Sequence, residues 1–225
     1  MHLGRQGSLS RTTDVADLLR PAGDPATWVF TGDSITHGAY HTHGRRSFVE
    51  HFQERVRWEL RRTADCVINT GISGNTVTEV LDAFDHRVAR FAPDVVAVML
   101  GTNDATGGEN GVEDFTRGLS ELVSRIKKVG SHVLLQTPPP IDTQSAPERR
   151  CLRNYVDVIR DVAREGAVAL VDHHDYWARR DLAHEMRSDA LHPNARGHLQ
   201  LARKLFIDLD IFDEASPTCA LEISE

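Results

Sequence analysis

The feature that most constrains the fold is a rhythm of short apolar segments that alternate with helix-like segments along the chain. One apolar segment, Val95 to Leu100, is continuously apolar instead of alternating between apolar and polar residues. Such a run is typical of a strand that is covered on both faces in a parallel sheet. Strands are expected at residues 27–31, 66–69, 94–100, 133–136 and 168–172.

Segments with apolar residues at helical spacing lie between these strands. In residues 45–62, for example, Phe48, Phe52 and Val56 fall on one face, which predicts an amphipathic helix packed on the sheet. The other helices are expected at residues 76–91, 112–129, 148–165 and 195–209. Strand and helix thus alternate five times, which predicts a three-layer α/β/α fold: a parallel sheet, right-handed crossovers and helices on both faces.

The length of 225 residues fits one such domain, which we place at residues 27–210. Residues 1–26 are polar and contain one short helical candidate, Asp14 to Arg20, so we expect an N-terminal arm. The acidic residues 211–225 are expected to form a frayed C-terminal tail. No internal repeat and no linker that could separate two domains is visible in the sequence.

Charge and composition argue against several classes of function. The formal net charge is −7 and no basic block is present, which argues against nucleic-acid binding. The longest apolar run is too short to span a bilayer, and the first residues lack the apolar core of a secretory signal. We therefore expect a cytoplasmic protein without a membrane partner, and the sequence leaves the oligomeric state open.

The three cysteines are widely spaced and form neither a CxxC pair nor a disulfide framework. This pattern favours a reducing compartment. Cys66 opens a predicted strand and is expected to be a buried, small apolar residue.

A candidate nucleophile follows the first predicted strand. The apolar run breaks at Gly32, and Asp33 and Ser34 come next. Ligands of open α/β sheets bind at the carboxyl ends of the strands, which is where Ser34 is expected to lie. A serine hydroxyl needs a base, a group that orients the base, and donors that stabilise an oxyanion.

Donors for an oxyanion are expected after the second and third strands. Gly74 precedes a helix, and its backbone N–H can approach a ligand closely because the residue has no side chain. Asn103 follows the third strand and carries a carboxamide donor. Together with the backbone N–H of Ser34, these groups would form a three-donor oxyanion hole.

The base is expected after the fifth strand. Asp189 and His192 are three residues apart, so they can meet within one turn, and Pro193 and Asn194 keep His192 out of the last helix. The carboxylate of Asp189 would hold the imidazole in the tautomer that accepts a proton from Ser34. The sequence thus predicts the catalytic residues Ser34, Asp189 and His192.

The order of these blocks resembles that of the SGNH or GDSL hydrolase superfamily. The matching blocks are Gly32-Asp33-Ser34, Gly74, Gly101-x-Asn103-Asp104 and Asp189-x-x-His192-Pro193, and none departs from the family pattern. They lie within residues 27–207, nearly the whole domain. The resemblance implies a flavodoxin-like sheet of order 2-1-3-4-5, hydrolysis of acyl esters through an acyl-enzyme, and no metal or other cofactor. The G-x-S-x-G elbow of the α/β-hydrolases is absent.

Several residues around these blocks have alternative roles. His37, His41 and Arg45 are expected to line the mouth of the pocket, although the cluster of His37, His41 and His43 could instead bind a metal. Asp33 and Asp104 flank the site, and we expect them to brace turns, with substrate contact as the alternative.

Three further groups are taken as non-catalytic or stay open. Ser73 is expected to be a structural turn residue, and residues 173–175 are expected at the surface. Tyr176 and Trp177 lie in a loop-like stretch and could form a substrate wall or pack in the core.

The primary hypothesis is a serine esterase. The loops at residues 39–44 and 137–147 look polar and short of aromatic residues, which favours short acyl esters of a small polar or sugar-like alcohol over long-chain lipids. An acyltransferase with the same residues is a second hypothesis, because the sequence does not define whether water or an alcohol accepts the acyl group. A non-catalytic binding protein that has kept the fold is the third.

Overall fold

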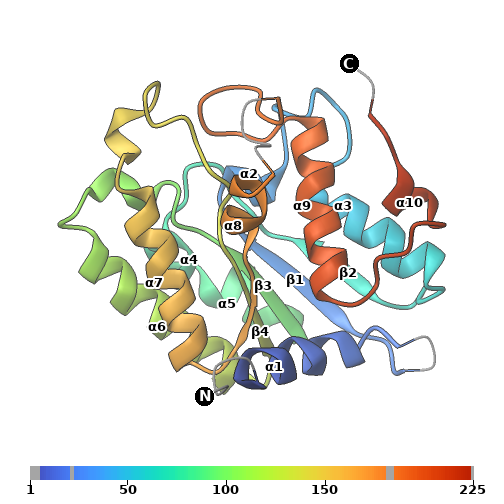
Figure 1. Ribbon diagram of the computed structural model, residues 1–225. Helices are drawn as coiled ribbons and strands as arrows, with labels where there is room; N and C mark the ends of the chain where they lie inside the picture. The colour runs from blue at the N-terminus through green and yellow to red at the C-terminus, as the bar shows by residue number, and fades with distance from the viewer. Residues whose placement is uncertain (1–5, 21–22, 181–184, 224–225) are drawn as a thin grey trace.

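Five parallel strands form the centre of the molecule in the residues that the computed structural model describes, 6–20, 23–180 and 185–223 (Figure 1). They are β1 (Thr27–Gly32), β2 (Cys66–Asn69), β3 (Val95–Met99), β4 (His132–Gln136) and β5 (Ala169–Val171). Their order in the sheet is β2-β1-β3-β4-β5, and every pair is parallel. The predicted fold class and strand order are therefore confirmed.

Helices cover both faces of the sheet (Figure 1). One face carries α1 (Gln6–Asp17), α3 (Phe48–Gln53) and α9 (Ala195–Asp208), and the other carries α4 (Val77–Asp82), α5 (Phe84–Arg87), α6 (Val112–Lys128) and α7 (Leu152–Glu165). In β1, Trp28 and Phe30 join the first core while Val29 joins the second, because successive side chains point to opposite faces. Every residue of β3 is buried, as its continuous apolar run predicts.

The helix predicted at residues 45–62 is present, but the observed helix differs from the prediction at both ends. It begins at Phe48, because Ser47 and Glu50 form a capping box in which each side chain accepts from the other's backbone N–H. From Glu54 to Glu59 the helix widens into a π-helix, η1. The predicted apolar face is correct, since Phe48, Phe52 and Val56 are fully buried.

The helix predicted at residues 76–91 is broken into α4, α5 and a 3-10 turn, η2 (Ala89–Phe91). Thr76 and Glu79 form a capping box at its start. The guanidinium of Arg87 turns inward and donates to the backbone oxygens of Gly32 and Thr70. These bonds tie the helical segment to the ends of β1 and β2, a contact that helical periodicity does not reveal.

Short elements complete the described fold. They are α2 (Ser34–His37), η3 (Asp104–Gly107), η4 (Pro147–Arg149), α8 (His173–Ala178) and α10 (Pro217–Ala220). The expectation of a frayed C-terminal tail is wrong for residues 211–223: Cys219 is buried, and the carboxylate of Glu59 accepts hydrogen bonds from Ser216 and Thr218. At the other end, α1 contains residues 14–17 of the predicted helix 14–20 but begins earlier, at Gln6, and Leu18 to Arg20 form tighter turns ahead of Pro21.

Two predictions about burial are also wrong. Cys66 is exposed, because β2 is an edge strand whose ends reach solvent. His173 is fully buried and its Nε2 lies 3.0 Å from Oε1 of Gln136, so residues 173–175 are not all at the surface. Trp177 is also fully buried in α8, which makes it a core residue.

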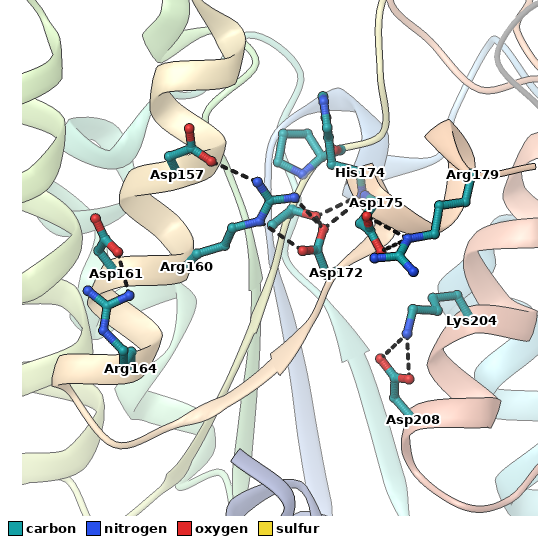
Figure 2. A network of polar contacts seen from close by, with 12 residues as sticks. Asp157, Arg160, Asp161, Arg164, Asp172, His174, Asp175, Arg179, Lys204 and Asp208 are labelled. Carbon is teal, nitrogen blue, oxygen red and sulfur yellow. Dashed lines mark hydrogen bonds and ion pairs between the residues drawn. The ribbon is translucent and has the colours of Figure 1, made fainter. Parts of the chain in front are cut away.

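The ends of β4 and β5 are joined by a polar network around Asp172 (Figure 2). Arg160 of α7 binds both carboxylate oxygens of Asp172, at 2.8 and 3.2 Å, and Thr137 donates to the same carboxylate at 3.0 Å. Burial raises the pKa of Asp172, but the Arg160 guanidinium and the backbone N–H of Asp175 outweigh it and hold that pKa below its usual value. The network fixes the start of the loop that leads from Thr137 to Arg149.

No helix in the described part of the chain is long and apolar enough to cross a membrane. The cytoplasmic location stays a prediction.

Candidate active site

Ser34 begins the short helix α2 directly after β1. Asp33 caps this helix, with Oδ1 accepting from the backbone N–H of Ile35 at 2.9 Å. A side chain at Gly32 would not fit, because its Cβ would lie 2.3 Å from the backbone oxygen of Met99. The tight turn therefore requires glycine at 32, and it leaves the side chain of Ser34 partly exposed. The backbone N–H of Ser34 is the first of helix α2, a position that has no acceptor within the helix.

The three predicted catalytic residues form a continuous relay. Ser34 Oγ lies 2.9 Å from Nε2 of His192, and Nδ1 of His192 lies 2.9 Å from Oδ2 of Asp189. Ser34 and His192 are 158 positions apart in the sequence, so only the sheet topology brings them together. This geometry allows His192 to accept the hydroxyl proton of Ser34 while Asp189 faces the other ring nitrogen.

Asp189 is held in place by its own loop. Its Oδ1 accepts hydrogen bonds from the backbone N–H groups of Leu191 at 2.7 Å and His192 at 2.8 Å. Partial burial raises the pKa of Asp189, but the hydrogen bonds from these amides and from the imidazole together lower it below the usual value. Asp189 therefore stays ionised at neutral pH and can stabilise an imidazolium at His192.

The three predicted oxyanion donors come from the ends of β1, β2 and β3. Gly74 has a left-handed backbone (φ 85°), and no heavy atom of the described structure beyond its two chain neighbours lies within 4 Å of the place where a Cβ would stand, so the residue borders open space. Asn103 uses one N–H to donate to the backbone oxygen of Asn75 at 3.0 Å, which leaves its second N–H for a ligand.

Two arginines that sequence reasoning missed hold these donor segments. Nη2 of Arg149 donates to Oδ1 of Asn103 at 3.4 Å, and its Nε donates to the backbone oxygen of Thr102 at 3.0 Å. Arg87 binds the backbone oxygens of Gly32 and Thr70, and the side chain of Asn75. Neither arginine lies in a recognisable motif, so no sequence signal marked them.

Asp33 and Asp104 brace turns, as expected. Asp104 accepts from the backbone N–H groups of Val77 at 2.9 Å and Gly101 at 3.0 Å. Burial is the main reason that the pKa of Asp33 is raised to about 7 and that of Asp104 to about 6. A neighbouring carboxylate also raises each pKa: Asp104 acts on Asp33, and Glu79 acts on Asp104. The second oxygen of Asp33 has no hydrogen-bond partner among the described residues. Asp33 is buried, and both oxygens of Asp104 accept from backbone amides, so substrate contact by either carboxylate stays a prediction.

We expect Asp33→Asn to flatten the pH dependence of stability. The folded carboxyl keeps its proton up to about pH 7, whereas the unfolded one loses it near pH 3.8. The native state thus binds more protons in this window, so the unfolding free energy falls as pH rises, by about 4 kcal/mol from this group. Urea denaturation between pH 4.5 and 7.5 measures this change in the unfolding free energy. Asp82→Asn, at an exposed aspartate, is the control, and a constant difference between wild type and Asp33→Asn would contradict the expectation.

The residues predicted at the mouth of the pocket are placed differently from one another. His37 is exposed, and its Nδ1 lies 3.1 Å from the hydroxyl of Ser73. The ring of His41 stacks on His192, with centroids 3.6 Å apart and planes 5° apart. Arg45 lies elsewhere, in a cavity of about 260 Å³ next to Asn194. A cavity of about 810 Å³ between η1 and α10 contains none of the predicted site residues.

A metal at the histidines would have to displace the relay. In the described part of the chain, one group of side chains brings its possible ligand atoms close enough to bind a single metal ion: His41, Asp189 and His192. A ring nitrogen binds metal in the plane of its ring, and the planes of His41 and His192 are nearly parallel, so one ion cannot lie in both. The arrangement fits a base and its neighbour better than a metal site.

Comparison with known proteins agrees with this geometry. The model of the GDSL-like lipase/acylhydrolase family matches residues 30–199. The acetylxylan esterase of Geobacillus stearothermophilus is 28% identical over 150 residues, which cover 61% of this chain and 68% of that protein. The multidomain esterase of Ruminococcus flavefaciens is 22% identical over 220 residues, covering 82% of this chain and 28% of that one.

The fold is shared with solved structures. An α/β-hydrolase enzyme from the metagenome of Lake Arreo, Spain, superimposes with a TM-score of 0.73 at 24% identity, covering 86% of this chain and 99% of that one. The match to the family model spans most of the domain, so the site and fold define a carboxylic ester hydrolase. The chain belongs to the GDSL-like lipase/acylhydrolase family.

Proposed function

We propose that the protein is a serine esterase that hydrolyses short-chain acyl esters, such as acetyl esters, of a small polar or sugar-like alcohol. The observation that carries this proposal is the relay from Ser34 Oγ through His192 to Asp189, with both contacts at 2.9 Å. The acetylxylan esterase of Geobacillus stearothermophilus supports it, since solved catalytic mutants of that protein replace one serine, one histidine or one aspartate with alanine.

The first half of the reaction forms an acyl-enzyme. Ser34 Oγ attacks the ester carbonyl as Nε2 of His192 takes the hydroxyl proton, and Asp189 stabilises the resulting imidazolium. The negative charge that develops on the carbonyl oxygen is stabilised by the N–H groups of Ser34, Gly74 and Asn103. The imidazolium then gives its proton to the departing alcohol oxygen.

The second half releases the acid. Water takes the place of the alcohol, His192 accepts one of its protons, and the new hydroxide attacks the acyl group on Ser34. The acid leaves as His192 returns the proton to Ser34 Oγ. No residue changes its oxidation state, and each proton that is taken is returned.

A panel of p-nitrophenyl esters with increasing acyl length tests the substrate class. We expect kcat/KM to be highest for acetyl or propionyl esters and to fall for longer chains, because polar loops border the site. A maximum at eight carbons or more would contradict the short-acyl proposal.

Adding candidate alcohols tests whether water or an alcohol accepts the acyl group. Formation of a new ester in place of free acid would identify an acyltransferase.

A further inference from the structure

Tyr40 is an exposed aromatic residue in the loop next to the relay. It lies in the loop between α2 and α3, and 83% of its surface is exposed, the highest value among the large apolar side chains that the structure describes. Its backbone is left-handed (φ 69°), a conformation that disfavours residues with a Cβ. Backbone strain of this kind tends to persist where function requires it.

Tyr40 is linked to the base through one ring. The rings of Tyr40 and His41 meet edge to face, with centroids 5.1 Å apart and planes at 85°. His41 in turn stacks on His192, and its Nδ1 lies 2.9 Å from the hydroxyl of Ser188. Contacts from the loop before α9 therefore fix the middle ring, and the three rings run outward from the base (Figure 1 shows both loops at the carboxyl end of the sheet).

The chemistry of the reaction determines which half of the ester meets these rings. The departing alcohol oxygen takes its proton from Nε2 of His192, so it must lie within hydrogen-bond distance of that nitrogen. The carbonyl oxygen lies instead toward Gly74 and Asn103. The alcohol half thus extends from the His192 side of Ser34, where His41 and Tyr40 are the neighbouring rings.

We propose that Tyr40 is the outer wall of a subsite for the alcohol half of the ester, and that it selects alcohols with a saturated, hydroxylated ring such as a sugar. The proposal rests on the proposed esterase function. One aromatic face can pack against the C–H face of such a ring, while the exposed polar groups of His43 and Ser188 nearby suit its hydroxyls. A long alkyl chain would find a single apolar side chain among these polar groups.

Two acetyl esters that differ only in the alcohol test this role. For Tyr40→Ala, kcat/KM should fall about tenfold with glucose pentaacetate, the loss expected for one aromatic contact, and change less than twofold with ethyl acetate. Tyr40→Phe, which keeps the ring, should match wild type on both esters. Trp58→Ala is the matched control, because it truncates another exposed aromatic residue, 72% exposed, that lies in η1 at the cavity beside α10.

The outcomes separate this inference from the proposed function. An equal loss on both esters, or no loss on the sugar ester, would overturn the Tyr40 subsite. Hydrolysis of both esters that survives Ser34→Ala would overturn the esterase mechanism and the subsite with it. Circular dichroism and melting temperature of Tyr40→Ala should match wild type, because the side chain has almost no packing to lose.

Discussion

Replacing Ser34 with alanine should lower kcat for p-nitrophenyl acetate by roughly 10⁴-fold or more, with the fold unchanged. In the proposed mechanism this hydroxyl is the atom that attacks the ester, and its Oγ lies at hydrogen-bond distance from Nε2 of His192. The lost packing is one partly exposed oxygen, so the unfolding free energy should change by about 0.5 kcal/mol or less. Steady-state kinetics and urea denaturation measure both effects.

A double-mutant comparison makes this prediction sharper. His192→Ala should lose about as much activity as Ser34→Ala, and the double variant should be no worse than either, because residues that act as one relay are not additive. Ser73→Ala is the matched control, since Ser73 is a nearby exposed serine bound to His37 and outside the relay. If the loss of kcat in the double variant equals the product of the two single losses, the two residues act independently.

Replacing Asn103 with alanine should lower kcat by about 10²–10³-fold and leave KM within a few fold. The carboxamide has one N–H committed to Asn75, and in the proposed mechanism the other donates to the oxyanion, which forms only during the reaction. Loss of that donor therefore reduces the stabilisation of the transition state more than it reduces the binding of the substrate. Asn103→Asp should be at least as damaging, because a carboxylate cannot donate and repels the oxyanion.

Asn110→Ala controls for loss of an asparagine from the same exposed loop region. Arg149 gives a graded comparison, because it donates to Oδ1 of Asn103 and to the backbone oxygen of Thr102 and so orients the carboxamide. Arg149→Met should therefore reduce kcat less than Asn103→Ala. If Asn103→Ala keeps kcat within tenfold of wild type, Asn103 is not an oxyanion donor.

Much of the fold was predictable because its signals are local. The continuous apolar run at β3 and the alternating helices define a parallel sheet, and all five strands lie within two residues of their predicted bounds. The strand order was expected from the family resemblance and is confirmed. The helices were less accurate at their ends, since the capping box at Ser47 and the inward turn of Arg87 depend on tertiary contacts.

The candidate site was predictable where residues sit in short motifs at strand ends. Ser34 and His192 meet at hydrogen-bond distance as the motifs require. Periodicity could not reveal that His41 stacks on His192, that Arg45 lies in another cavity, or that Arg149 reaches Asn103 from the loop after β4. These positions depend on the paths of loops, for which the sequence carries no regular pattern.

The exposure of single residues was the weakest prediction. Cys66 was expected to be buried because it opens a strand, but an edge strand has neighbours on one side only. His173 was expected at the surface as part of the cluster at residues 173–175, but it is buried with Gln136 as its partner. Tyr40 lies in a loop whose polar composition drew no attention to its one aromatic side chain.

Trapping of the acyl-enzyme tests the central claim most directly. The protein is mixed with p-nitrophenyl acetate, quenched in acid within milliseconds, digested and mapped by mass spectrometry. One acetyl group should appear on the peptide that carries Ser34, at a rate equal to the first release of p-nitrophenol, and it should be absent in Ser34→Ala. A burst of p-nitrophenol with no acetyl group on Ser34, or an acetyl group on another residue formed at the rate of that release, would contradict the account.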